Sequence, residues 1–267
     1  MEEGIQEERL RKKRQRLGRM MTYLRQGLVC EMGCGSGFVL EFLSANLAGS
    51  VLIGVDRSPE RLGTVASKGL RGVLGVAADI TVRVMDTNRF DSVVFIWSLH
   101  EVYSQSGDTG VTSALKTAAE LLKSDGVIVI QDFLRPEPGQ AAVGFKNAGT
   151  FARFKRFAEE FEQRRVTYDV AGQTVRLDIA DAVEFVSKSD ITDEDEWRDE
   201  MAETHFFYTL GDHKLRAAEA GLRVASGERF PLEWTAVDAA RLDMDFDFSP
   251  HFCWTQLVLK KAGPGYS

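Results

Sequence analysis

A glycine-rich run lies between a short apolar segment and a helical segment near the N-terminus. The apolar segment Leu28-Val-Cys-Glu-Met32 leads directly into Gly33-Cys-Gly-Ser-Gly37, and residues 38–47 repeat apolar side chains at helical spacing. Glycines at a strand-to-helix turn allow a tight bend and let the backbone approach a ligand closely. The run therefore predicts the start of a βαβ unit with a ligand site at the strand end.

The same alternation continues along the first half of the chain. Apolar runs at residues 51–55, 72–77, 90–97 and 127–130 predict strands, and the segments from 58 and 110–123 between them have helical patterns. Near-continuous apolar strands separated by helices are typical of a parallel sheet covered on both faces. The 267 residues are enough for one large α/β domain with an insertion.

Two acidic residues follow the second and third predicted strands. Asp56 comes about 20 residues after the glycines, where a carboxylate can bind both hydroxyls of a ribose. Asp79 follows the next strand, in position for the far side of a nucleoside. The glycine spacing Gly-x-Gly-x-Gly differs from the dinucleotide fingerprint, which disfavours a pyrophosphate ligand. A nucleoside-containing ligand is predicted at the carboxyl ends of these strands.

The sequence resembles class I S-adenosylmethionine-dependent methyltransferases. The resemblance rests on Val29-Cys-Glu-Met-Gly-Cys-Gly-Ser-Gly-Phe-Val-Leu, Gly54-Val-Asp-Arg-Ser-Pro-Glu, Ala78-Asp-Ile, Phe90-Asp-Ser-Val-Val-Phe and Leu121-Leu-Lys-Ser-Asp-Gly-Val-Ile-Val-Ile. It implies a Rossmann-like sheet with strand order 3-2-1-4-5-7-6, the last strand antiparallel, and S-adenosylmethionine as cofactor. The cofactor-binding residues that it implies are Glu31, Gly33, Cys34, Gly35, Gly37, Asp56, Arg57, Ala78, Asp79, Ile80 and Trp97.

Candidate catalytic residues follow the fourth strand, in Trp97-Ser-Leu-His-Glu-Val-Tyr103. In this fold the position faces the transferred methyl group, and a histidine can deprotonate a hydroxyl or thiol near neutral pH. His100 is a candidate general base, and Glu101 could hold an amine or orient His100. The alternative for each is an ordinary hydrogen bond at a strand end. Asp132 ends the fifth strand and could face the same cavity. Glu203, His205 and Tyr208 could close the pocket from above, and the alternative for them is ordinary hydrogen bonding in a helix-to-helix junction.

The strand–helix rhythm breaks after Asp132. Residues 133–142 read as a loop, and 144–165, 166–179 and 180–205 read as a helix, a hairpin and further helices. We predict a core at 27–132 and 206–262, a basic N-terminal helix at 1–26, a tail at 263–267 and a helix–hairpin–helix lid at 133–205. Its aromatic residues suggest a lid over a small acceptor. They are Phe145, Phe151, Phe154, Phe157, Phe161, Tyr168, Phe185 and Trp197.

Charge and cysteine content restrict the function classes. The net charge of −7 argues weakly against a nucleic-acid-binding surface, although residues 1–26 hold eight Lys or Arg against four Glu. Three cysteines without paired spacing favour the cytoplasm over a disulfide framework. No histidine pair has metal-ligand spacing, so no metal site is predicted. No apolar run or leader predicts a membrane span or signal peptide.

Three functions remain open at this point. The leading one is methylation of an O or N atom of a small molecule. The second is an RNA or tRNA methyltransferase guided by the basic N-terminal helix. The third is a non-catalytic nucleoside-binding or scaffold protein, which the complete cofactor motif set disfavours. The sequence identifies neither the acceptor nor the oligomeric state.

Overall fold

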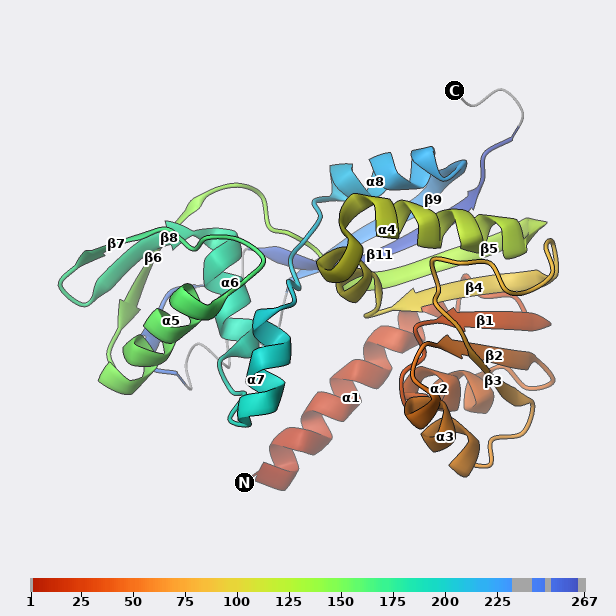
Figure 1. Cartoon of the computed structure of the whole chain (residues 1–267), viewed down its shortest axis with the longest axis horizontal. Helices are drawn as coiled ribbons and strands as arrows, with labels where there is room; N and C mark the ends of the chain where they lie inside the picture. Colours follow the sequence, from red (N-terminus) through yellow and green to blue (C-terminus); the bar gives the residue numbers. More distant parts are fainter. Residues whose placement is uncertain (1, 232–241, 248–250, 264–267) are drawn as a thin grey trace.

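A central seven-stranded sheet organises the larger part of the molecule (Figure 1). The computed structural model describes residues 2–231, 242–247 and 251–263. The strand order is β3-β2-β1-β4-β5-β11-β9, and β11 runs antiparallel to both of its neighbours. This confirms the predicted Rossmann-like order. The strands are β1 (Leu28–Met32), β2 (Val51–Asp56), β3 (Val73–Ala77), β4 (Phe90–Ile96), β5 (Leu122–Phe133), β9 (Leu222–Pro231) and β11 (Phe252–Lys261).

Helices cover both faces of this sheet, because successive strand residues are apolar on both sides. In β4, Val93 and Phe95 belong to the cluster under one set of helices, whereas Val94 and Ile96 belong to the cluster on the other face. The first face carries α4 (Leu99–Leu121) and α8 (Leu210–Glu219), and the second carries α1 (Glu2–Met20), α2 (Phe38–Asn46) and α3 (Pro59–Ser67) (Figure 1).

A second, four-stranded sheet with order β10-β6-β8-β7 lies beside the first (Figure 1). We call this part the inserted unit. Its elements are β6 (Gln140–Phe145), α5 (Ala148–Glu160), β7 (Tyr168–Ala171), β8 (Thr174–Asp178), α6 (Ile179–Lys188), α7 (Glu194–Met201) and β10 (Met244–Asp245). The hairpin and the helices occur in the predicted order, but α5 is shorter than the predicted helix over 144–165, and α7 ends before residue 205. The prediction of a loop through residue 142 is wrong, because β6 pairs antiparallel with β8.

The strand β10 comes from the segment between β9 and β11 and pairs with β6. A range assigned to the core by sequence thus supplies an edge strand to the inserted unit. Two residues carry no detectable periodicity, so only the long-range pairing reveals this strand.

The aromatic residues of the inserted unit form its own core. Phe154, Phe157 and Phe185 are fully buried and pack on one another with ring centroids 5.4 to 5.7 Å apart. Trp197 belongs to the same cluster. The surfaces of these buried rings are used to fold the unit, so these rings do not line an acceptor pocket.

Other boundaries differ from the prediction by local structure. The N-terminal helix ends at Met20 and not near 26, while α4 begins at Leu99, well before residue 110. A kink at Gly107, with φ of 57°, separates the two halves of α4. The described residues contain no helix that is both long and apolar enough to cross a membrane.

Candidate active site

The glycine-rich loop is fixed between β1 and β2 by backbone hydrogen bonds. The N–H groups of Gly33 and Cys34 both donate to the carbonyl of Val55, at 2.8 and 3.0 Å. A Cβ on Gly33, where φ is 80°, would lie 2.7 Å from the Cβ of Ser98, whereas one on Gly35 would meet no atom within 4 Å. Gly33 is therefore required for close packing of the loop against the N-cap of α4, and Gly35 leaves open space beside it.

Two carboxylates from successive strand ends join this loop. Asp56 accepts hydrogen bonds from the backbone N–H groups of Gly35 at 2.8 Å and Ser58 at 2.9 Å. Asp79 accepts two from Thr81, and these bonds hold the pKa of Asp79 below its usual value. Both side chains are thus held in fixed orientations at the carboxyl ends of β2 and β3.

A pocket opens where these strands end. Seven of the predicted residues line it, which are Gly33, Asp56, Arg57, Ala78, Asp79, Ile80 and Glu101. Sequence reasoning missed Arg61, Thr81, Ser98, Val102, Gln105 and Ser106, which complete the lining. Three of the missed residues lie in the first turns of α4, a segment that was not predicted to be helical.

The remaining predicted cofactor residues surround the loop without lining this pocket. Cys34 packs against Gly54, since a Cβ there would lie 2.8 Å from its Sγ. Burial raises the pKa of its thiol to about 12, so Cys34 is a packing residue and not a nucleophile. Gly37, with φ of 80°, is the N-cap of α2.

Glu31 is buried beneath the loop with an incomplete hydrogen-bond set. Its exposed fraction is 2%, and its Oε2 has no hydrogen-bond partner. Burial and the nearby Asp56 raise its pKa well above the usual value. A cationic group beside the loop would satisfy this carboxylate. The orphaned oxygen of Glu31 and the open space at Gly35 both fit a bound S-adenosylmethionine with its ammonium group near Glu31.

A second group of side chains forms around His100, at the start of α4. Its Nδ1 lies 2.7 Å from Oδ1 of Asp132, which ends β5 and is fully buried. The other oxygen of Asp132 accepts the backbone N–H of Leu99 at 2.9 Å. Burial alone would lower the pKa of His100, but Asp132 overrides this effect and raises it to about 9. His100 and Asp132 are therefore an ion pair near neutral pH.

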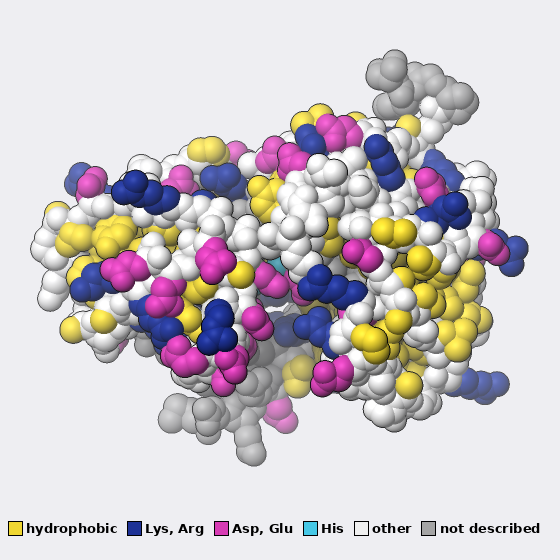
Figure 2. All heavy atoms as spheres, in the orientation of Figure 1, with side chains coloured by type: hydrophobic (Ala, Val, Ile, Leu, Met, Phe, Trp, Pro, Cys, Tyr) yellow, Lys and Arg dark blue, Asp and Glu magenta, His cyan; other side chains and the backbone are white. Residues whose placement is uncertain are grey.

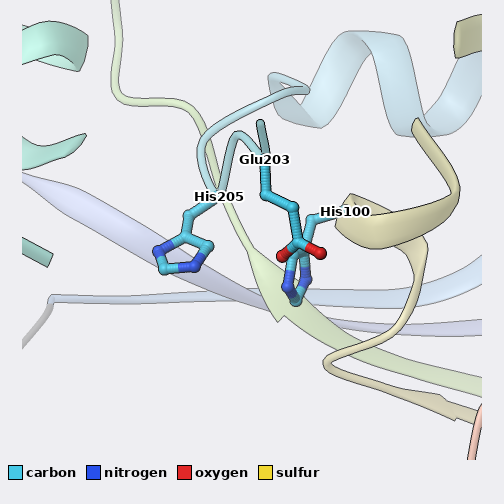
Figure 3. Close-up of side chains that lie close together, drawn as sticks. All are labelled: His100, Glu203 and His205. Atoms are coloured by element: carbon cyan, nitrogen blue, oxygen red, sulfur yellow. The ribbon is translucent and has the colours of Figure 1, made fainter. Parts of the chain in front are cut away.

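The inserted unit brings Glu203 and His205 to the same place (Figure 3). His205 stacks on Phe133 with centroids 4.4 Å apart and meets the His100 ring edge-on at 5.3 Å. One ligand-capable atom each of His100, Glu203 and His205 lies within 4.8 Å of the other two. Figure 2 shows a hollow between the core and the inserted unit.

The three side chains have a composition that can bind a metal ion, which the sequence did not predict. However, both ring nitrogens of His205 have partners: Nδ1 lies 3.0 Å from Ser187 Oγ and Nε2 lies 3.3 Å from Glu200 Oε2. A metal would have to displace one of them. His100 and Glu203 remain the available groups of the cluster.

Trp97 lies in an aromatic row that connects α2 to the inserted unit. The centroid of its ring lies 6.4 Å from that of Phe38 and 5.9 Å from that of Trp254. The ring centroids of Trp254 and Phe133 are 4.7 Å apart. Trp97 has a left-handed backbone with φ of 55°. The indole N–H groups of Trp97 and Trp254 are buried without hydrogen-bond partners, so this row can donate to a ligand.

Comparison with known proteins agrees with this geometry. A family model described as a methyltransferase domain matches residues 2–226. No curated protein matches the sequence.

Similar solved structures share the fold at low sequence identity. They include the CcbJ methyltransferase of Streptomyces caelestis, at 16% identity and a TM-score of 0.54, covering 94% of this chain and 89% of that one. The 1,6-didemethyltoxoflavin-N1-methyltransferase of Burkholderia thailandensis, with bound S-adenosylhomocysteine, has 15% identity and a TM-score of 0.51, covering 95% and 78%. A methyltransferase from Methanosarcina mazei has 13% identity and a TM-score of 0.53, covering 91% and 96%. The chain belongs to the methyltransferase domain family and is an S-adenosylmethionine-dependent methyltransferase.

Proposed function

We propose that the enzyme methylates an O or N atom of a small-molecule acceptor bound between the strand ends of the core and the inserted unit. The observation that carries this proposal is the meeting of His100 and Asp132 from the core with Glu203 and His205 from the inserted unit. In this arrangement the inserted unit acts as a lid that excludes water from the acceptor.

We assign the cofactor to the pocket at the ends of β1, β2 and β3. Asp56 would bind the ribose hydroxyls, Asp79 and Ile80 would hold the adenine, and Glu31 would face the ammonium group. Bound S-adenosylmethionine supplies a methyl group on a positively charged sulfur. The chain itself contributes alignment of the acceptor and the removal of a proton.

His100 is the proposed general base. Asp132 holds its Nδ1, so the Nε2 atom can take a proton from the acceptor. In the protein alone its pKa of about 9 favours the protonated ring. A positive charge in the neighbouring pocket lowers a histidine pKa, so cofactor binding is expected to increase the neutral, basic fraction.

The basic side chains of α1 support a small molecule over RNA. Lys13, Arg16 and Arg19 lie over the rings of Trp97, Trp254 and Phe230, at 5.6, 4.7 and 4.3 Å from the ring centroids. These cations hold α1 on its own protein. An RNA-binding function would instead produce RNA affinity that falls steeply as salt rises.

We also propose a cytoplasmic location. Cys30, Cys34 and Cys253 are all free and buried, which suits a reducing compartment.

The direct test is calorimetric titration with S-adenosylhomocysteine, followed by methyl-transfer assays with candidate acceptors. Asp56→Ala is expected to weaken cofactor binding, and His100→Ala to lower turnover with the cofactor affinity retained. Equal turnover in His100→Ala would remove the general-base assignment.

A further inference from the structure

Two carboxylates without partners flank His100. Glu101 follows it directly at the start of α4 and lines the cofactor pocket, and Glu203 comes from the segment after α7. Both side chains are half-buried. Within the residues that the structure describes, neither carboxylate accepts a hydrogen bond or joins an ion pair. Two half-buried acids that lack partners lose part of their hydration, and a cationic ligand would compensate this loss.

The spacing around His100 suits one bridging atom. The Glu203 carboxylate and the His100 ring lie close together (Figure 3), and no ion pair of 4.0 Å or less joins them. The side chain of His100 is 7% exposed, and its Nε2 has no hydrogen-bond partner in the described part of the chain. Two hydrogen bonds of about 2.8 Å meeting at a tetrahedral atom span about 4.6 Å. That span lies within the 4.8 Å limit of the cluster.

A metal ion fits this spacing less well than a bridging nitrogen. Two zinc bonds of about 2.1 Å at a tetrahedral ion span only about 3.4 Å. Closing the cluster to that size would also break a contact of His205 with Ser187 or Glu200. The geometry therefore favours a hydrogen-bonded ligand atom between Glu203 and His100.

The charges around the gap favour a cation. Burial raises the pKa of Glu203, and the nearby Glu101 raises it further. Burial also raises the pKa of Glu101, which His100 and Arg61 partly oppose. Burial and then Lys188 lower the pKa of His205, so this ring is expected to be neutral.

Two basic groups of the inserted unit, Lys188 and Arg164, are already engaged by other carboxylates. Lys188 pairs with Glu200 at 2.7 Å, and Arg164 pairs with Asp181 at 2.7 Å. The fully buried Glu184 lies within 3.7 Å of both cations. Both cations are thus paired with other carboxylates, and the lowering of the Glu203 pKa by His100 and Lys188 does not overcome its burial. An incoming cation would complete the compensation of Glu203.

We propose that the methyl acceptor is an amine that enters as an ammonium ion and is held by Glu203 and Glu101. This proposal rests on the proposed function and narrows its acceptor to nitrogen. With the cofactor bound and the His100 ring neutral, the ammonium gives one proton to Nε2 of His100, which releases it to solvent. The nitrogen lone pair then forms the bond to the methyl carbon, and the carbon–sulfur bond breaks with its electrons on sulfur. The products are a methylated ammonium ion, S-adenosylhomocysteine and one proton.

The first test compares two ligands of the cofactor site by calorimetry. In sinefungin, a carbon bearing an ammonium group replaces the sulfur of S-adenosylhomocysteine. A charge-assisted hydrogen bond to a carboxylate is expected to make sinefungin bind at least about tenfold more tightly than S-adenosylhomocysteine. Glu203→Gln should reduce the ratio of sinefungin affinity to S-adenosylhomocysteine affinity at least threefold. It should leave the affinity for S-adenosylhomocysteine unchanged.

The matched control is Glu159→Gln, which removes an exposed carboxylate from α5 of the same unit. It should leave the ratio at the wild-type value. A wild-type ratio near one, or a ratio that Glu203→Gln does not change, overturns the amine proposal. If the wild-type protein does not bind S-adenosylhomocysteine at all, the proposed function is contradicted instead. Failure of the amine proposal and failure of the proposed function are therefore distinguishable.

The second test probes the acceptor side. Benzylammonium and the neutral benzyl alcohol are titrated into the S-adenosylhomocysteine complex. Benzylammonium is expected to bind about tenfold more tightly than the alcohol, and Glu203→Gln should remove the difference. Equal binding of the two compounds, or binding of neither, contradicts an ammonium subsite.

Discussion

His100 and Asp132 form a buried pair that connects the ends of β4 and β5. The Nδ1–Oδ1 distance is 2.7 Å, and the exposed fractions of the two side chains are 7% and 0%. Asp132 also accepts the backbone N–H of Leu99 and that of Phe133. The carboxylate of Asp132 thus fixes the His100 ring, the first turn of α4 and the end of β5.

Asp132→Asn should lower the pKa of His100, because the neutral amide no longer stabilises the imidazolium ion. We expect kcat to fall about a hundredfold because the imidazole ring loses its orientation. The acid limb of the pH–rate profile, where His100 becomes protonated, should move to lower pH. The measurement is a pH–rate profile with the acceptor found by screening. An acid limb at the wild-type position would contradict the pairing.

The stability of the protein should fall as the pH rises above neutrality. The pKa of His100 is raised in the folded state, from 6.5 to about 9. Its contribution is therefore complete below pH 6.5 and lost as the pH approaches 9. The difference in unfolding free energy is at most roughly 3 kcal/mol.

Urea unfolding at pH 6 and pH 9.5 measures this change. The matched variant is His100→Gln, which keeps a polar side chain and removes the titration. Its unfolding free energy should change less over the same interval. An equal decrease in both proteins would assign the pH dependence to other groups.

Gly35→Val should abolish cofactor binding while preserving the fold. A Cβ at this position meets no protein atom, so its side chain would occupy space beside the pocket. We expect S-adenosylhomocysteine affinity to fall more than a hundredfold by calorimetry. Gly49→Val is the control, because Gly49 also has positive φ and open surroundings but lies outside the glycine-rich loop. An equal loss of S-adenosylhomocysteine affinity in both variants would indicate backbone strain as the cause.

Lys188→Met should destabilise the inserted unit strongly. Lys188 is fully buried, donates to the carbonyl and carboxylate of Glu200, and lies 3.6 Å from Glu184. Removing its charge leaves two carboxylates without their buried cation, at a cost of about 3–5 kcal/mol. Thermal or urea unfolding measures this loss.

The double variant Lys188→Met with Glu184→Gln tests whether the cost is electrostatic. Replacing the fully buried carboxylate as well should restore part of the stability, giving a favourable coupling free energy. Strictly additive losses would show that packing, and not charge, holds Lys188 in place.

Much of the sheet followed from local patterns. The apolar runs that become β1, β2, β4 and β5 are buried on both faces, and that burial requires the near-continuous hydrophobicity visible in the sequence. The two-residue β10 left no local signal because its pairing with β6 spans about 100 residues of sequence. Phe154 and Phe157 were correctly predicted to lie on one helix face, but only the packing shows that they fill a core.

The amino-acid sequence by itself was enough to locate the pocket that we propose for the cofactor. The glycines, Glu31, Asp56 and Asp79 occur at strand ends, and parallel strand ends meet at one edge of a sheet, so local pattern is sufficient. For the proposed acceptor half, the sequence supplied candidate residues, and the tertiary structure decided which of them meet. His100 and Glu203 are a hundred residues apart, and only the folding of the inserted unit back onto β4 and β5 brings them together.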